Sequence, residues 1–363
     1  MKIINLSLYI LDVPLITPFK TALRTVESVS DVIVCLETDS GEVGYGEAPP
    51  TKAITGETKE SIIATLDGPI RKAIVGQEID NLDHICNLLD SCIEHNTSAK
   101  AAADIAIYDL YGKLHKQSVA KLFGASRDEI ITDITISVNE PEEMAEDAKK
   151  AIARGFKTLK VKVGSNPEKD VDRLIAIREA IGNDYTIRID ANQAWKPLEA
   201  IELLTDMQNH NIGLELVEQP VIAKDLDGLK YVTMHSPVPV VADEAVFSPN
   251  DAYNIFKNDI ANMCNIKLMK CGGLHNALKI AEYAEEFHKE CMLGCMLEAK
   301  VSVNAAVQLA CAKNVVTKID LDGPLLCSED PVVGGCILDA PKIKLGEGYG
   351  LGVSEIIGLK SIE

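Results

Sequence analysis

The sequence predicts a (β/α)₈ barrel preceded by a smaller α+β unit, and two observations carry this prediction. Residues 1–125 show strand patterns followed by separate helical patterns, which is typical of an α+β unit. From about residue 130 to residue 324, eight short strand-like runs alternate strictly with helical segments. Parallel strands joined by right-handed helical crossovers close into a barrel in this way. An open, doubly wound sheet shows the same alternation and stays the alternative fold.

The N-terminal unit begins with an antiparallel hairpin. Residues 3–13 and 29–38 have strand character, and a turn at Ser40-Gly41 leads into a returning strand at residues 42–48. Helical spacing of apolar residues then recurs in three segments, at residues 58–75, 82–94 and 98–114. We therefore expect a small sheet accompanied by separate helices.

The second part of the chain supplies the barrel strands. They are expected at residues 131–138, 158–163, 186–190, 214–218, 238–243, 264–268, 291–297 and 317–320. Helix starts are marked by Pro167 and by Ser248-Pro249, which suit the first turn of a helix. From about Pro324 the tail is rich in Gly and Pro, and we expect it to pack on the N-terminal unit or the barrel rim. The predicted domains are therefore residues 1–125, joined by part of residues 325–363, and the barrel at residues 126–324.

Composition and charge exclude several classes of partner. The 363 residues contain 36 Lys and Arg against 55 Asp and Glu, a formal net charge of −19, which disfavours nucleic acid and anionic membranes. The longest apolar run is shorter than the roughly 18 residues that a membrane-spanning helix needs. The ten cysteines include no CxxC pair, and residues 1–5 lack the pattern of a signal peptide. We therefore expect a cytoplasmic protein.

Three acidic residues end three consecutive predicted strands. Asp190, Glu218 and Asp243 are separated by 28 and 25 residues, about one βα unit each. The carboxyl ends of barrel strands form the active site, so these side chains should converge and would repel one another without a cation. Hard oxygen ligands with open positions for substrate suit Mg²⁺. The alternative interpretation is that each carboxylate caps the helix that follows it.

Lysines flank this acidic group on both sides. Lys160 and Lys162 end the second predicted strand and Lys267 lies on the sixth, which faces the second across a closed barrel. One lysine can remove the α-proton of a metal-bound carboxylate, giving an enediolate, and a lysine on the opposite face can return a proton. This arrangement predicts racemisation or epimerisation. The alternative is that the lysines only pair with the carboxylates.

Ordered motifs identify a family. They are Lys160-Val161-Lys162, Asp190-Ala191-Asn192, Glu218-Gln219-Pro220, Ala242-Asp243-Glu244, the run at residues 265–273 and the run at residues 294–298. The chain resembles the muconate-lactonising-enzyme subgroup of the enolase superfamily, and within it the dipeptide epimerases of the L-Ala-D/L-Glu epimerase type. The resemblance implies an α+β capping domain on a modified barrel. It also implies one Mg²⁺ per subunit on Asp190, Glu218 and Asp243, with Lys162 and Lys267 as acid/base residues.

The resemblance also implies how the substrate is held at its amino end. Asp320 and Asp322 match the motif with which dipeptide epimerases bind the free α-ammonium group. Two carboxylates on one strand face would give a cation strong charge-assisted hydrogen bonds. The alternative is a cap or turn before Gly323-Pro324.

Four further residues are expected to bind substrate. By the resemblance, Lys160 contacts the substrate carboxylate and Arg24 recognises a glutamate side chain, for which bidentate pairing suits an arginine. Thr135 and Cys295 should line the pocket. Lys270, three residues after Lys267, is expected to face outward or into the start of a helix.

The predicted function is an Mg²⁺-dependent dipeptide epimerase that inverts the α-carbon of the C-terminal residue, on L-Ala-D/L-Glu or a similar dipeptide. The alternatives within the superfamily are an N-acylamino acid racemase, an o-succinylbenzoate synthase and a muconate cycloisomerase. A non-catalytic barrel, acting as a binding or structural protein, is the alternative from another functional class. The expected partners are the small dipeptide and further copies of the chain, with no nucleic acid and no membrane. Peptidoglycan peptide metabolism is the process that the resemblance suggests.

Overall fold

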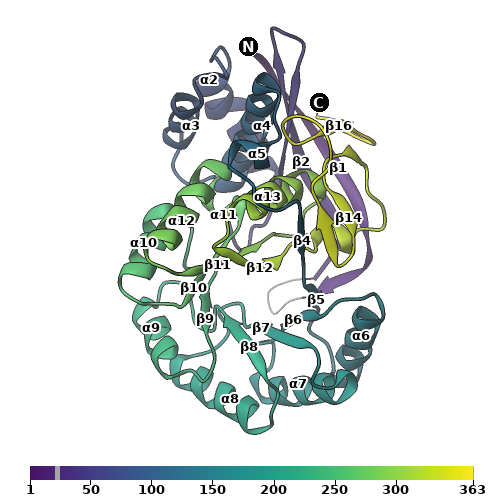
Figure 1. The fold of residues 1–363 in the computed structure, drawn as a ribbon, viewed down its shortest axis with the longest axis vertical. Coiled ribbons are helices and arrows are strands. Elements are labelled where there is room, and N and C mark those ends of the chain that lie inside the picture. Colours follow the sequence, from purple (N-terminus) through teal and green to yellow (C-terminus); the bar gives the residue numbers. More distant parts are fainter. Residues whose placement is uncertain (21–24, 363) are drawn as a thin grey trace.

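The computed structural model describes residues 1–20 and 25–362 and has an eight-stranded parallel sheet at its centre (Figure 1). The strands lie side by side in the order of the sequence. They are β5 (Ile134–Ile136), β6 (Thr158–Lys162), β7 (Thr186–Asp190), β8 (Leu214–Glu218), β9 (Val240–Ala242), β10 (Met263–Ile266), β11 (Glu290–Gly294) and β12 (Val316–Asp320). The predicted barrel is confirmed, and the open sheet is excluded.

Helices connect successive strands and surround the sheet in Figure 1. They are α6 (Pro141–Ala153), α7 (Pro167–Ile181), α8 (Pro197–Asn209), α9 (Leu226–His235), α10 (Pro249–Lys257), α11 (Leu268–Cys271), α12 (Leu274–Glu286) and α13 (Lys300–Ala312). The expected start of α10 is observed, because Ser248 accepts a hydrogen bond from the backbone of Asp251 and Pro249 occupies the first turn. After β12 the chain enters the 3₁₀ turn η2 (Gly323–Leu326) and then the tail. The barrel is therefore a modified one.

The first and last barrel strands meet at a junction that corrects one predicted strand. The single run expected at residues 131–138 is two strands, β4 (Glu129–Ile131) and β5, interrupted at Thr132-Asp133. The interruption follows from contacts with β12: the backbone N–H of Asp133 donates to the carbonyl of Ile319 over 3.2 Å, and Thr132 Oγ1 accepts the N–H of Leu321 at 2.9 Å. These contacts span the gap between β5 and β12.

The N-terminal part lies above the barrel in Figure 1 and is built on the antiparallel sheet β17-β1-β2-β3. Its strands are β1 (Ile3–Lys20), β2 (Thr25–Thr38) and β3 (Val43–Ala48), with β17 (Lys360–Ser361) added from the tail. Its helices are α1 (Lys59–Thr65), α2 (Arg71–Ile74), α3 (Leu82–Ser91), α4 (Thr97–His115) and α5 (Val119–Leu122). The helix expected at residues 58–75 contains a π-helical segment, η1 (Leu66–Ile70), around Pro69, which lacks the N–H of a regular turn.

The remaining tail strands pair among themselves and with β4. They are β13 (Val332–Gly334), β14 (Ile337–Asp339), β15 (Lys342–Lys344) and β16 (Val353–Ile356). Strand β13 pairs with β16, and β15 lies between β14 and β4. The tail therefore packs on both the N-terminal part and the barrel, as expected, while the exact domain boundaries stay a prediction.

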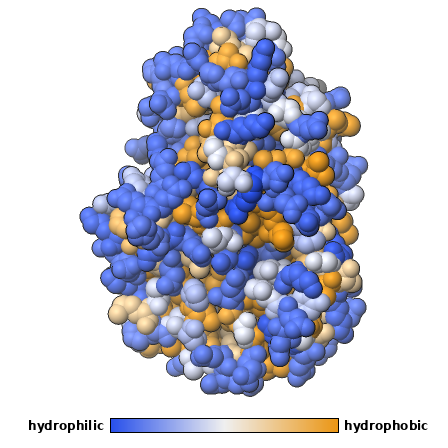
Figure 2. Space-filling model, viewed as in Figure 1, coloured by the Kyte–Doolittle hydropathy of each residue, from blue (hydrophilic) through white to orange (hydrophobic). Residues whose placement is uncertain are grey.

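The side chains inside the barrel change from apolar to charged along the barrel axis. Leu216, Val241, Met263 and Met292 form a buried apolar cluster, whereas the inward side chains at the carboxyl ends of the strands are mostly charged. Because side chains alternate along a strand, the residues two positions later on the same inner face form the polar layer. Figure 2 shows apolar residues gathered near the middle of the visible face, where the N-terminal part meets the barrel. Each helix in the described residues is too short or too polar to cross a membrane.

Candidate active site

The charged layer is built from the last residues of neighbouring strands. Lys162, Asp190 and Glu218 occupy paired positions on β6, β7 and β8, so the strand register alone brings their side chains together. Asp243 directly follows β9. The three carboxylates are buried, and each offers an oxygen that lies within 4.8 Å of the others.

These three carboxylates fit a magnesium ion. Each donor is an oxygen, which is the ligand type that Mg²⁺ prefers. Burial, together with the nearby Asp190 charge, raises the pKa of Glu218 to about 7, although Lys160 opposes this. A divalent cation bound between the three carboxylates would favour the charged form of Glu218. The predicted metal ligands are thus assembled as a set, whereas three separate helix caps would not converge.

The lysines of β6 are bonded to the acidic group. Lys162 Nζ donates to Asp190 Oδ2 over 2.6 Å. Lys160 Nζ is fully enclosed and lies 2.6 Å from Glu218 Oε2, 2.7 Å from Asp320 Oδ2 and 3.2 Å from Asp190 Oδ2. Burial alone would raise the pKa of Asp190, but Lys162 and Lys160 lower it to about 2. Lys160 therefore binds three protein carboxylates here, and its predicted contact with substrate stays a prediction.

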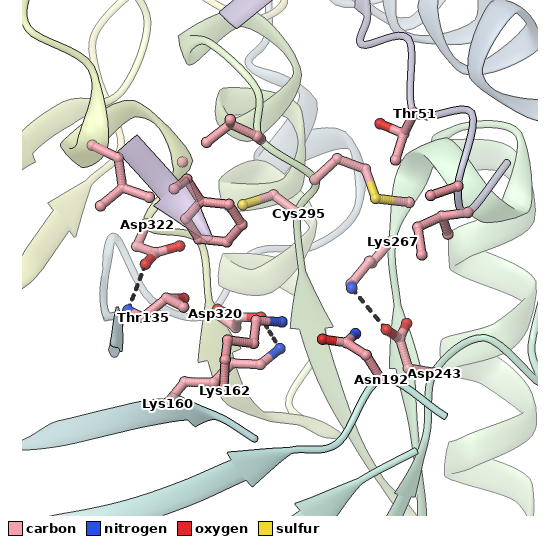
Figure 3. Close-up of a pocket in the computed structure, with 17 residues that line it drawn as sticks. Thr51, Thr135, Lys160, Lys162, Asn192, Asp243, Lys267, Cys295, Asp320 and Asp322 are labelled. Atoms are coloured by element: carbon pink, nitrogen blue, oxygen red, sulfur yellow. Dashed lines mark hydrogen bonds and ion pairs between the residues drawn. The ribbon is translucent and has the colours of Figure 1, made fainter. Parts of the chain in front are cut away.

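Lys267 approaches the same space from the opposite wall. Figure 3 shows Lys162 and Lys267 on opposite sides of the pocket. Lys267 Nζ donates to Asp243 Oδ2 over 2.8 Å. Burial alone would lower the pKa of Lys267, but Asp243 raises it, so this lysine carries a proton when its carboxylate partner is charged. Two amines thus face one space, as proton transfer at both faces of one carbon requires.

Space for Lys267 depends on a glycine in the next strand. Gly294 ends β11, and a Cβ atom there would lie 2.9 Å from the Asn265 amide and 3.1 Å from Cε of Lys267. Both distances are shorter than an ordinary van der Waals contact. A side chain at position 294 would therefore displace the side chains of Asn265 and Lys267.

Two further carboxylates line the pocket near Thr135. The Thr135 N–H donates to Asp322 Oδ2 over 2.7 Å, and Asp320 is bonded to Lys160. Burial and the neighbouring Asp320 raise the pKa of Asp322 to about 6. Burial alone would raise the pKa of Asp320, but Lys160 and Lys267 lower it. The Asp322 carboxylate would therefore be stabilised by a bound cation.

A pocket lies between these groups. It brings together eight of the predicted site residues: Thr135, Lys160, Lys162, Asp243, Lys267, Cys295, Asp320 and Asp322. Its apolar wall comes from the N-terminal part and from the loops after β11 and β12, and includes Phe19, Ile54, Met296, Leu297 and Leu326. Arg24, the predicted side-chain ligand, lies outside the described residues.

Two residues near the predicted metal ligands make contacts that the sequence prediction missed. Asn265 Nδ2 donates to Glu218 Oε1 over 2.7 Å. This contact could have been predicted from the sequence, because Asn265 precedes Lys267 by two residues on an inward strand face. Lys270 was expected to face outward or into a helix start. It does lie in the short helix α11, but its side chain is buried and forms an ion pair with Asp243. Strand periodicity was wrong for it because the strand ends at Ile266.

Known proteins are similar to this chain over its whole length. Residues 5–124 match the mandelate racemase / muconate lactonizing enzyme N-terminal domain, and residues 143–355 match the enolase C-terminal domain-like family. The L-Ala-D/L-Glu epimerase of Clostridium acetobutylicum is 54% identical over 346 residues, covering 95% of this chain and 97% of that relative.

Two solved structures have the same fold. A substrate-liganded complex of the L-Ala-D/L-Glu epimerase from Bacillus subtilis superposes with a TM-score of 0.96 at 41% identity, covering 99% of each chain. The dipeptide epimerase from Enterococcus faecalis, complexed with Mg and the dipeptide L-Leu-L-Tyr, superposes with a TM-score of 0.94 at 42% identity, covering 98% of this chain and 100% of that one.

Proposed function

The chain belongs to the mandelate racemase / muconate lactonizing enzyme family of the enolase superfamily, and from that premise we propose that it is an isomerase, an Mg²⁺-dependent dipeptide epimerase. The observation that carries the proposal is one pocket with lysines on opposite walls, three converging carboxylates beneath them and a separate pair of carboxylates at one end. The relatives and the solved complexes with Mg and dipeptide support the same assignment.

The two lysines carry the chemistry. Magnesium, held by Asp190, Glu218 and Asp243, would stabilise the negative charge that develops on the substrate carboxylate. Lys162 or Lys267, depending on the epimer, takes the α-proton as a neutral amine, so that a C–H bond breaks and an N–H bond forms. For Lys267 this requires that a cation bound to Asp243 offset the carboxylate charge that raises the lysine's pKa. The electron pair left on the α-carbon delocalises into the adjacent carboxylate. The ammonium group of the other lysine then donates its proton to the opposite face, which inverts the configuration.

The remaining groups select the substrate. Asp320 and Asp322 would bind the free α-ammonium group of a dipeptide, and the raised pKa of Asp322 supports this because a cation would favour its charged form. N-acylated amino acids carry no such cation, which separates this proposal from an N-acylamino acid racemase. We assign L-Ala-D/L-Glu as the substrate type, with Thr135 and Cys295 lining the pocket and Arg24 as the expected partner of the glutamate side chain.

Further assignments follow from the same reading of the chain. We propose a capping domain at residues 1–125 with part of the tail, and a catalytic barrel at residues 126–324. We also propose a homo-oligomer in the cytoplasm that acts in peptidoglycan peptide metabolism. The ten cysteines, all free, support a reducing compartment.

Deuterium incorporation tests the function directly. In D₂O with Mg²⁺, L-Ala-L-Glu should give its epimer labelled at the glutamate α-carbon, as detected by proton NMR and mass spectrometry. EDTA should stop the reaction and added Mg²⁺ should restore it, whereas N-acetyl-L-Ala-L-Glu should react at least tenfold more slowly. Lys162→Ala and Lys267→Ala should each abolish epimerisation, although exchange from one epimer can survive in each variant. Full activity in both variants would refute the mechanism.

A further inference from the structure

A second buried lysine stands behind Lys267. Lys270 has 0% of its surface exposed, which is exceptional for a lysine. Its Nζ lies 2.5 Å from Asp243 Oδ1 and also donates to the backbone carbonyl of Asp243 and, over 3.1 Å, to that of Asn265. The ammonium group is therefore matched by one carboxylate and two carbonyl oxygens.

The turn that carries Lys270 is held by the N-terminal part. Gly273 has a φ of +117°, and a Cβ atom there would lie 2.3 Å from Asp104 Oδ1 of α4. Asp104 in turn accepts a hydrogen bond from the backbone N–H of Leu274 at the start of α12. A side chain at position 273 would push this turn away from α4. Gly273 and Asp104 together therefore fix the position of the turn that carries Lys270.

Asp243 is thereby held from two sides. Lys267 binds its Oδ2 atom over 2.8 Å, and Lys270 binds its Oδ1 atom. On the opposite wall Asp190 also receives two lysines, but both at Oδ2, Lys162 over 2.6 Å and Lys160 over 3.2 Å. Lys162 and Lys267 thus each share a carboxylate with a second, more deeply buried lysine.

We propose that Lys270 is a positioning residue, which fixes the Asp243 carboxylate and through it the place of the Lys267 amine at one face of the substrate. This rests on the proposed epimerase function. Without Lys270, Asp243 keeps only one ammonium partner and can rotate about its side-chain bonds, and Lys267 then follows it. The Lys162 wall has its own pair of lysines and is unaffected. The inference therefore predicts that α-proton exchange slows at the Lys267 face more than at the Lys162 face.

The first test examines geometry without metal or substrate. A crystal structure of metal-free Lys270→Met should show the Asp243 carboxylate turned and Lys267 Nζ displaced together with it, with Lys162 and Asp190 unchanged. A variant in which Asp243 and Lys267 superpose on the parent structure would overturn the proposal. This readout does not depend on activity, so it separates failure of the inference from failure of the proposed function.

The second test measures exchange at each face. Lys162→Ala and Lys267→Ala first identify which epimer of Ala-Glu is deprotonated by which lysine, from α-deuterium incorporation in D₂O. Lys270→Met should then slow exchange from the Lys267-dependent epimer at least tenfold more than exchange from the other. Lys270→Gln, which keeps a donor to the same acceptors, should recover part of the loss and guards against a variant that does not fold. An equal fall in both directions, or no fall, would refute a positioning role.

A matched control exists in the N-terminal part. Lys113 Nζ likewise donates to a backbone carbonyl, that of Val43, and over 2.9 Å to a buried carboxylate, Asp109. Lys113→Met therefore removes the same kinds of contact away from the pocket. It should change thermal stability without altering the ratio of the two exchange rates. A shift of that ratio in Lys113→Met would show that loss of any such lysine suffices, and would overturn the specific role of Lys270.

Discussion

Substituting Glu298 by glutamine should remove a defined part of the pH dependence of folding. Glu298 directly follows the pocket-lining residues 295–297 in the sequence, and 2% of its surface is exposed. Its Oε1 accepts the backbone N–H of Met296 over 2.6 Å, and its Oε2 accepts the hydroxyl of Ser302. Burial raises the pKa of Glu298 to about 7; the nearby Glu47 adds to the rise, and the hydrogen bonds from Ser302 and Met296 oppose it.

The sign of the effect follows from proton binding. Between the ordinary pKa of 4.5 and the folded value of about 7, folded Glu298 holds a proton that the unfolded chain has released. Folding stability therefore falls as the pH rises through this window, and the stabilisation is complete only below it. Each pKa unit corresponds to about 1.4 kcal/mol, so the loss attributable to Glu298 is about 3 kcal/mol. Glutamine does not titrate and should lack this loss.

Urea unfolding of metal-free protein measures the difference. We expect the free energy of unfolding of Glu298→Gln minus that of the parent to rise by about 3 kcal/mol between pH 4.5 and pH 7.5, as each pKa unit is worth about 1.4 kcal/mol. Other buried carboxyls with raised pKa values, such as Glu218 and Asp322, titrate in both proteins and cancel in the difference. The same substitution at the exposed Glu60 controls for the loss of one charge. Parallel pH curves for the parent and Glu298→Gln would refute the reasoning.

Three further substitutions test the site and its supports. Gly294→Ala should cost about 1–3 kcal/mol of stability, and it should lower kcat about 100-fold with less change in KM, because the new Cβ displaces Lys267. An unchanged kcat would contradict this. Asp322→Asn should raise KM for L-Ala-L-Glu at least tenfold and leave any activity on N-acylated substrates unchanged, and an equal effect on both would exclude ammonium binding there. Gly273→Ala should lower the melting temperature several degrees more than Gly41→Ala, which also has positive φ but no atom within 4 Å of its Cβ; equal shifts would deny the steric role.

The barrel and its polar layer were predictable because strand-like and helical segments alternate along the sequence and because charged residues end several of the strands. Strands at residues 186–190 and 214–218 were placed to the residue, since each run of buried residues ends in a charged residue before the next helix begins. The parallel register then aligns the last residues of neighbouring strands. The strand expected at residues 291–297 instead ends at Gly294, and Cys295 begins the pocket wall. An apolar run in the sequence does not by itself show where a strand ends and where an apolar loop that lines the pocket begins.

The remaining features depend on contacts between distant segments. The break at Thr132-Asp133 is set by β12, which is almost 190 residues later in the chain. The burial of Lys270 depends on the turn at Gly273 and on Asp104. Neither feature has a local pattern, so the sequence gives no signal until the barrel is closed. The prediction for Arg24 stays untested.

The position of the pocket wall depends on both parts of the molecule. The lysines and the three predicted metal ligands lie at the ends of barrel strands, whereas Phe19 and Ile54 come from the N-terminal part. The segment between β11 and α13 joins the two, because Glu47 of β3 accepts the N–H groups of Ala299 and Ser302, each over 2.9 Å. These carboxylate contacts lie at the N-terminus of α13, where the helix dipole favours negative charge. A strand of the N-terminal part therefore fixes the loop that carries part of the pocket wall. The apolar wall of the pocket and the lysines opposite it are thus positioned relative to each other by this buried link and not by the barrel alone.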